Sequence, residues 1–115
     1  MASDQDRHSA RLAALRSTYE NAFALYADAP RRTPEKDAAR IEMFRAEKNY
    51  NDGLESALGA NDDQLAKLEE DIKGLNETAT ELRKQNAAFT ERVRKISDAI
   101  DKGLDLLSRA VEAVT

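Results

Sequence analysis

The sequence predicts an all-α protein in which an antiparallel helical hairpin, within a three-helix arrangement, is joined to one long C-terminal coiled-coil helix. Two observations predict this class. Apolar residues recur from Leu54 to Val114 with alternating spacings of four and three, and this 3.5-residue period keeps one seam of a helix facing another helix. The 115 residues are also 35% charged and only 5% aromatic. Such a composition favours one thin, elongated helical domain over residues 9–115 rather than a thick globule.

The first helix is expected over about residues 9–29, after a polar tail of residues 1–8. Its apolar side chains repeat at spacings of three and four, as a helix requires. We expect four of them in the intrachain core: Leu12, Leu15, Tyr19 and Tyr26. Pro30 cannot continue the helix and predicts a turn at this point.

The second helix is expected over about residues 34–58, with Thr33 as its N-cap and Pro34 as its first residue. Its core candidates are Met43, Phe44 and Tyr50. Beyond it, Gly59 to Asp62 combine a helix breaker with capping side chains, which favours a turn. The apolar repeat nevertheless passes through these residues without a change of phase, so the sequence does not exclude a continuous helix.

The last helix is expected over about residues 62–114, which would make it about 80 Å long. Its first half adds Leu65, Leu68, Ile72 and Leu75 to the expected core. The hairpin is too short to cover the second half, and exposing a row of large aliphatic side chains is costly. We therefore expect a partner to cover an interface made of Asn86, Phe89, Val93, Ile96, Ile100, Gly103, Leu104, Leu107, Val111 and Val114.

Two positions interrupt the apolar repeat in this half. Asn86 occupies a layer position, where a buried amide lowers stability while fixing register and oligomeric state. The alternative is that Asn86 faces solvent in an irregular bundle. Gly103 either permits a close approach of another helix, allows a kink, or is a tolerated weak point in the helix.

Composition argues against several classes of function. The net charge is -4, whereas nucleic acids and anionic membranes attract a basic face. The chain has no Cys, and its single histidine, His8, has no ligand or catalytic partner at a recognisable spacing. We therefore expect no enzyme activity, no catalytic or cofactor-binding residue, and no metal. No signal peptide or membrane span is recognisable, so a cytoplasmic location is the default expectation.

The function expected from these features is that of a non-enzymatic coiled-coil structural or assembly protein. It would oligomerise through the C-terminal heptad seam, as a scaffold, a spacer, or a subunit of a helical, filamentous or viral-type assembly. An alternative is an adaptor or chaperone that binds another protein's helix along the apolar face from Phe89 to Val114. A weaker alternative is peripheral binding to a lipid surface. The expected partners are thus proteins, in a homo-oligomer or a hetero-oligomeric helical complex.

Overall fold

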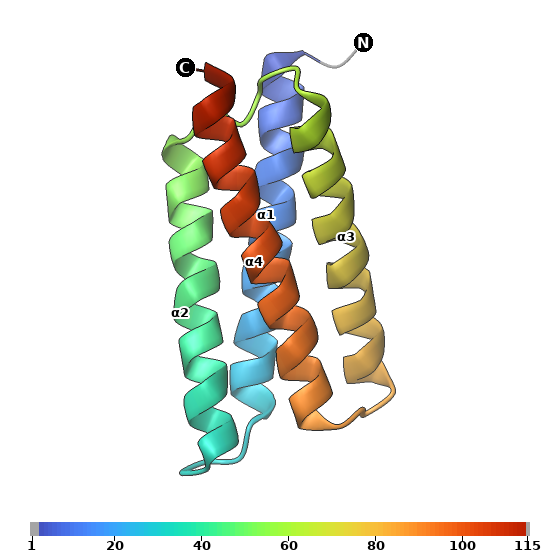
Figure 1. Ribbon diagram of the computed structural model, residues 1–115. Coiled ribbons are helices and arrows are strands. Elements are labelled where there is room, and N and C mark those ends of the chain that lie inside the picture. The colour runs from blue at the N-terminus through green and yellow to red at the C-terminus, as the bar shows by residue number, and fades with distance from the viewer. Residues whose placement is uncertain (1–2, 115) are drawn as a thin grey trace.

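A computed structural model describes residues 3–114 and shows four helices and no strand in this range. The helices are α1 (Asp4–Asp28), α2 (Pro34–Glu55), α3 (Asp63–Lys84) and α4 (Phe89–Val114) (Figure 1). The all-α class is therefore confirmed. The three-helix arrangement with a single long C-terminal helix is wrong, because the chain turns between α3 and α4.

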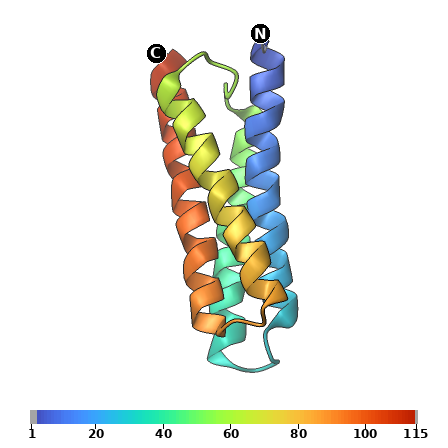
Figure 2. The ribbon, with the colours of Figure 1, turned by 90° about the vertical axis from the view of Figure 1, so that its right-hand side faces the viewer.

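The four helices form a rod of 44 × 23 × 17 Å. Helices α1 and α2 make one antiparallel hairpin, and α3 and α4 make the other (Figures 1 and 2). Between the hairpins α1 packs against α3, α2 packs against α4, and α1 meets α4 across the centre. Helices α2 and α3 lie diagonally opposite each other without direct packing, so the segment that connects them crosses one end of the bundle.

The ends of α1 and α2 follow local capping chemistry. Helix α1 begins five residues earlier than predicted, because the Ser3 and Asp6 side chains form a reciprocal capping box. The polar tail expected over residues 1–8 is consequently helical from Asp4 onward. Thr33 caps α2 as expected, and its hydroxyl accepts a hydrogen bond from the Lys36 N–H at 3.2 Å. Helix α2 ends at Glu55, three residues before the predicted boundary.

The turn that the sequence favoured before α3 is present. Residues 56–62 form an irregular segment, and Asp62 caps α3 by accepting hydrogen bonds from the N–H groups of Gln64 (2.9 Å) and Leu65 (3.2 Å). The acceptor carboxylate satisfies two of the amides that a helix start leaves unpaired.

The turn between α3 and α4 was not predicted. Asn86 adopts a left-handed backbone with φ of 53°, and two hydrogen bonds close the end of α3. The Ala87 N–H donates to the Leu82 carbonyl at 2.9 Å, and the Asn86 N–H donates to the Arg83 carbonyl at 3.1 Å. This is a Schellman motif, in which Asn is a tolerated substitute for Gly. Asn86 is exposed, so its predicted role as a buried layer in a coiled coil is wrong.

The core contains most of the predicted residues. Leu15, Leu65 and Ile72 are buried, and seven others are partly buried: Leu12, Tyr19, Tyr26, Met43, Tyr50, Leu68 and Leu75. Phe44 is wrong as a core residue, because it lies on the outer face of α2 and is 56% exposed. Helices α1 and α4 come close at Gly103, where an added Cβ would lie 3.0 Å from Leu15 Cδ2. Close approach is therefore the correct reading of Gly103.

The burial that the sequence assigned to a partner comes from the chain itself. Ile96, Ile100, Gly103 and Leu107 are all buried, because α4 folds back along α3 and also packs against α1 and α2. Ile96, Ile100 and Gly103 are therefore not available as a surface on the folded monomer, which corrects that part of the expected interface, while Leu107 keeps only a small exposed fraction.

Candidate functional site

The large apolar side chains that remain exposed are unevenly distributed over the bundle. Within residues 3–114 they come from α1, α2 and α4, and none comes from α3: Phe23, Ile41, Phe44, Leu54, Leu104, Val111 and Val114. Helix α2 lies between α1 and α4, so we call the side that carries these seven residues the α2-centred surface. Exposed apolar residues that gather on neighbouring helices are more typical of an interaction surface than single residues scattered over every helix.

A groove opens on this surface between the C-terminal halves of α2 and α4. It has a volume of about 500 Å³, and we call it the upper groove. Its lining residues are Asp52, Glu55, Ser56, Leu104, Leu107, Ser108 and Val111. Three predicted interface residues, Leu104, Leu107 and Val111, thus line one depression, and Leu107 forms its buried floor. Val114 lies one turn further along α4.

A second groove lies between the N-terminal ends of the same two helices. It has a volume of about 280 Å³, and its lining residues are Pro34, Glu35, Ala38, Phe89, Thr90 and Val93. Two predicted interface residues, Phe89 and Val93, are therefore half-buried here rather than exposed. Between the two grooves, Arg45 links α2 to α4, because its guanidinium bonds to Asp101 on α4 (2.5 Å) as well as to Glu42 on α2 (2.9 Å).

The α1 side of this surface is aromatic. The rings of Tyr19 and Tyr50 stack with their centroids 6.3 Å apart, and the Tyr19 hydroxyl donates to Glu47 at 3.2 Å. Burial of the hydroxyl and the nearby Glu47 carboxylate together raise the pKa of Tyr19. Phe23 lies one turn beyond Tyr19 on the same face of α1 and is 55% exposed.

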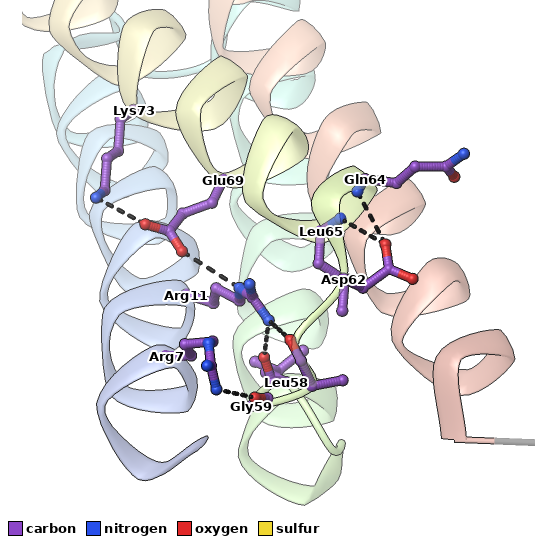
Figure 3. Close-up of polar contacts among 10 residues, drawn as sticks. Arg7, Arg11, Leu58, Gly59, Asp62, Gln64, Leu65, Glu69 and Lys73 are labelled. Carbon is purple, nitrogen blue, oxygen red and sulfur yellow. Dashed lines mark hydrogen bonds and ion pairs between the residues drawn. The ribbon is translucent and has the colours of Figure 1, made fainter. Parts of the chain in front are cut away.

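A buried arginine holds the segment that crosses the end of the bundle (Figure 3). Arg11 is 2% exposed. Its Nη1 donates to the Leu58 carbonyl and, at 2.8 Å, to the Ala60 carbonyl, while its Nε donates to Glu69 of α3 at 3.3 Å. A buried guanidinium is tolerated only when its donors are matched in this way. These contacts give Arg11 a structural role.

Two buried amides link the helices in a similar manner. Asn76 Nδ2 of α3 donates to the Ala14 carbonyl of α1 at 3.1 Å, and the Thr18 hydroxyl donates to Asn76 Oδ1 at 3.0 Å. Asn49 Nδ2 of α2 donates to the Ile100 carbonyl of α4 at 3.0 Å. Sequence reasoning overlooked these residues.

For α1 a usable signal existed in the sequence. Its buried face follows the spacing four, three, four, three through Arg11, Leu15, Thr18, Ala22 and Leu25. The prediction followed the neighbouring stripe instead, because Tyr19 and Tyr26 are more apolar than Thr18.

The opposite end of the bundle is joined by Asp28, the last residue of α1. Its Oδ2 accepts hydrogen bonds from Arg83 Nε of α3 and from Arg92 Nη2 of α4, each at 2.8 Å. The hydrogen bond from Arg83 is the main cause that holds the pKa of Asp28 below its usual value, and Arg92 adds to it against the opposing effect of burial. The carboxylate thus ties three helices together.

Neither a metal site nor a membrane span is evident in the described part of the chain. No group of three His, Cys, Asp or Glu side chains among residues 3–114 is placed to hold a metal ion, and His8 lies on the first turns of α1. No helix in this range is long and apolar enough to span a membrane.

No family model, curated protein or solved structure matches this chain.

Proposed function

We propose that this chain is a non-enzymatic assembly protein, which joins a larger helical complex by packing further helices onto its α2-centred surface. One observation carries the proposal: all seven large apolar side chains exposed within residues 3–114 lie on α1, α2 and α4. Helix α3 is also an outer helix of the bundle but carries none. Solubility alone gives no reason for this asymmetry, whereas an interface on one side requires it.

The size of this side suits a stable protein contact. One broad side of a rod measuring 44 × 23 Å covers roughly 1,000 Å², compared with about 800 Å² per partner in a standard interface. Mixed charges surround the apolar residues, as in a polar interface rim. Lys48 and Asp52 form one such pair at 2.7 Å. A lipid surface is favoured less, because helices that lie in a membrane interface carry a basic polar face.

Site-specific photocrosslinking tests this proposal. Benzoylphenylalanine would replace Phe44 on the α2-centred surface in one variant, and Glu77 on α3 in a matched control. Both positions are exposed, so neither replacement disturbs the core. The variants would be expressed at native level in the cells that produce the chain, and adducts would be identified by mass spectrometry.

A defined protein adduct from position 44, and none from position 77, is the expected result. Adducts to the chain itself identify a homo-oligomer, and adducts to a different protein identify a heteromeric complex. Equal labelling from both positions, or no adduct at position 44, contradicts the proposal.

A further inference from the structure

We propose that the upper groove binds an amphipathic helix of a different protein, with apolar residues along its centre and basic residues along its edges. This inference rests on the proposed function and specifies the partner's chemistry at one part of the α2-centred surface. Three observations carry it: the apolar stripe of α4, the small side chains of the groove wall, and the charge of the rim.

The apolar stripe has the spacing of a helix-binding surface. Leu104, Leu107, Val111 and Val114 follow one another at intervals of three, four and three along α4, so they lie on one face over about 15 Å. Leu107 is 8% exposed, while Leu104 and Val111 are 43% and 57% exposed. The stripe therefore places one nearly buried residue between two exposed ones on the same helix, which apolar residues at i, i+3 and i+7 of a docked helix can cover.

Small side chains permit a close approach. Ser56 from the end of α2 and Ser108 from α4 both line the groove. Their short hydroxyl side chains leave the depression open between the two helices, at a volume of about 500 Å³. Helix axes pack 8–10 Å apart depending on the side chains at the contact, so small residues at these positions favour a docked helix.

The rim of the groove is acidic. Asp52 and Glu55 line it from α2. On α4, Asp101 and Asp105 are exposed, and their spacing from Ser108 places them on the adjoining outer face of that helix. Lys48 pairs with Asp52 at 2.7 Å and Arg45 pairs with Asp101 at 2.5 Å. Glu55 and Asp105 have no ion pair among the described residues.

This excess of negative charge selects between the possible occupants. A second copy that met the groove around a two-fold axis would place one acidic rim against another, because a symmetric interface uses the same patch twice. Like charges brought together across an interface oppose association. A helix with Lys or Arg along both edges instead complements the rim while its apolar side covers Leu104 and Val111.

Peptide binding provides the test. The probe is an 18-residue synthetic helix with Leu at spacings of three and four, and Lys along both edges. Two comparison peptides carry Glu along the edges or the same residues in scrambled order. We expect fluorescence anisotropy to show that the basic-edged helix binds at least about tenfold more tightly than either comparison peptide, and that its affinity falls as salt rises.

Variants then locate the site. Leu104→Ser with Val111→Ser removes two apolar anchors, and it should weaken the Kd of the basic-edged helix by about tenfold or more. Glu55→Lys with Asp105→Lys should weaken binding and remove most of its salt dependence. Matched controls are Ala66→Ser, at an exposed position outside the α2-centred surface, and Glu70→Lys with Glu77→Lys, which makes the same change of charge at exposed positions of α3. These controls distinguish local recognition from a general attraction between a basic peptide and an acidic protein.

Equal binding of the basic-edged and acidic-edged helices overturns the inference. So does binding that the groove variants leave unchanged, or that the α3 control weakens as much. The two proposals fail separately: adducts from position 44 without peptide binding would leave the assembly role standing and remove only the basic helix as its partner.

Discussion

At the scale of single residues, buried polar side chains specify how the helices pair. Arg11, Asn49 and Asn76 each donate to a main-chain carbonyl of another segment of the chain. A shift of one helix along its neighbour would leave these buried donors unpaired, and an unpaired buried polar group costs about 1–3 kcal/mol. Small residues fill much of the remaining core, including Ala22, Ala39 and Ala46. Apolar packing alone therefore distinguishes poorly between neighbouring registers, and the polar contacts select one.

Replacement of Arg11 by Met tests this role. The change keeps much of the side-chain volume but leaves the carbonyls of Leu58 and Ala60 without this donor, and it removes one of the two cations that contact the partly buried Glu69. We expect the free energy of unfolding to fall by about 2–4 kcal/mol, measured by urea denaturation. A matched control is Arg16→Met, because Arg16 forms only an exposed ion pair with Glu20. Equal effects of the two changes would show that the buried contacts of Arg11 do not hold the crossing segment.

The Asp28 cluster predicts a specific dependence of stability on pH. Because its pKa is lower in the folded chain, mainly through Arg83, Asp28 stabilises the fold at any pH above its unfolded value of about 4. That contribution is lost as the pH falls through the lower folded value. Wild type should therefore be more stable than Asp28→Asn at pH 7, by about 1 kcal/mol, and the difference should shrink below about pH 4.

Urea unfolding of both proteins between pH 7 and pH 2.5 measures this difference. Asp98→Asn, at an exposed position of α4, is the matched control and should show no such convergence. A gap between wild type and Asp28→Asn that stays constant down to pH 2.5 would contradict the assignment.

At the scale of elements, local chemistry predicted two of the three turns. Pro30, with the Thr33 cap, marked the first, and the Gly59 to Asp62 segment marked the second, because breakers and caps act through neighbouring backbone groups. The third turn was missed for a physical reason. The repeat runs Leu82, Asn86, Phe89 across it without a change of phase, so a period alone cannot distinguish one helix from two. Only the rotation of Asn86 into the left-handed region separates them, and a single Asn signals this weakly.

The conformation of Asn86 reverses the mutational effect expected from a coiled coil. As a buried layer residue, Asn86 would give a more stable protein when replaced by Ile. At φ of 53° a β-branched side chain is strained instead, and we expect Asn86→Ile to lower the free energy of unfolding by about 1–2 kcal/mol. Asn86→Gly should be neutral or stabilising, because Gly favours this position.

Thermal and urea unfolding of the two variants, with Gln85→Ile as control, measure the effect. Gln85 is equally exposed but has a right-handed backbone, so its replacement should have little consequence. A stabilised Asn86→Ile protein would indicate that α3 and α4 form one continuous helix.

At the scale of the whole molecule, the C-terminal apolar row needs other helices to cover it, as the sequence predicted, but the prediction that a partner chain supplies them is wrong for the buried residues of that row. The need for covering helices follows from the cost of exposing large apolar side chains to water. Whether those helices belong to this chain or to another depends on whether the chain can turn back, and it does so at Asn86. Because it turns back, Ile96 and Ile100 are covered within the chain. Leu104, Val111 and Val114 stay exposed, and their predicted role in an interface stays a prediction. Phe23 and Ile41 joined the candidate surface only once the position of α2 was known.

The double change Ile100→Asp with Leu107→Asp distinguishes the two arrangements. On an extended helix covered by a partner, it would release a smaller, still helical species. In the four-helix bundle both side chains are buried, at 0% and 8% exposure, and each buried unpaired charge costs several kcal/mol against a total stability of about 5–15 kcal/mol. We therefore expect the chain to unfold, with loss of the helical circular dichroism signal.

The matched control places the same charges on the exposed side of the same helix. Leu104→Asp with Val111→Asp should keep the helical signal and a cooperative thermal transition, because these side chains are exposed to water in the folded chain on its own. Light scattering coupled to size-exclusion chromatography would then report whether this exposed pair, rather than the buried one, governs association. A helical monomer from Ile100→Asp with Leu107→Asp, obtained from an oligomeric wild type, would mean that the seam faces another chain and that α4 does not fold back.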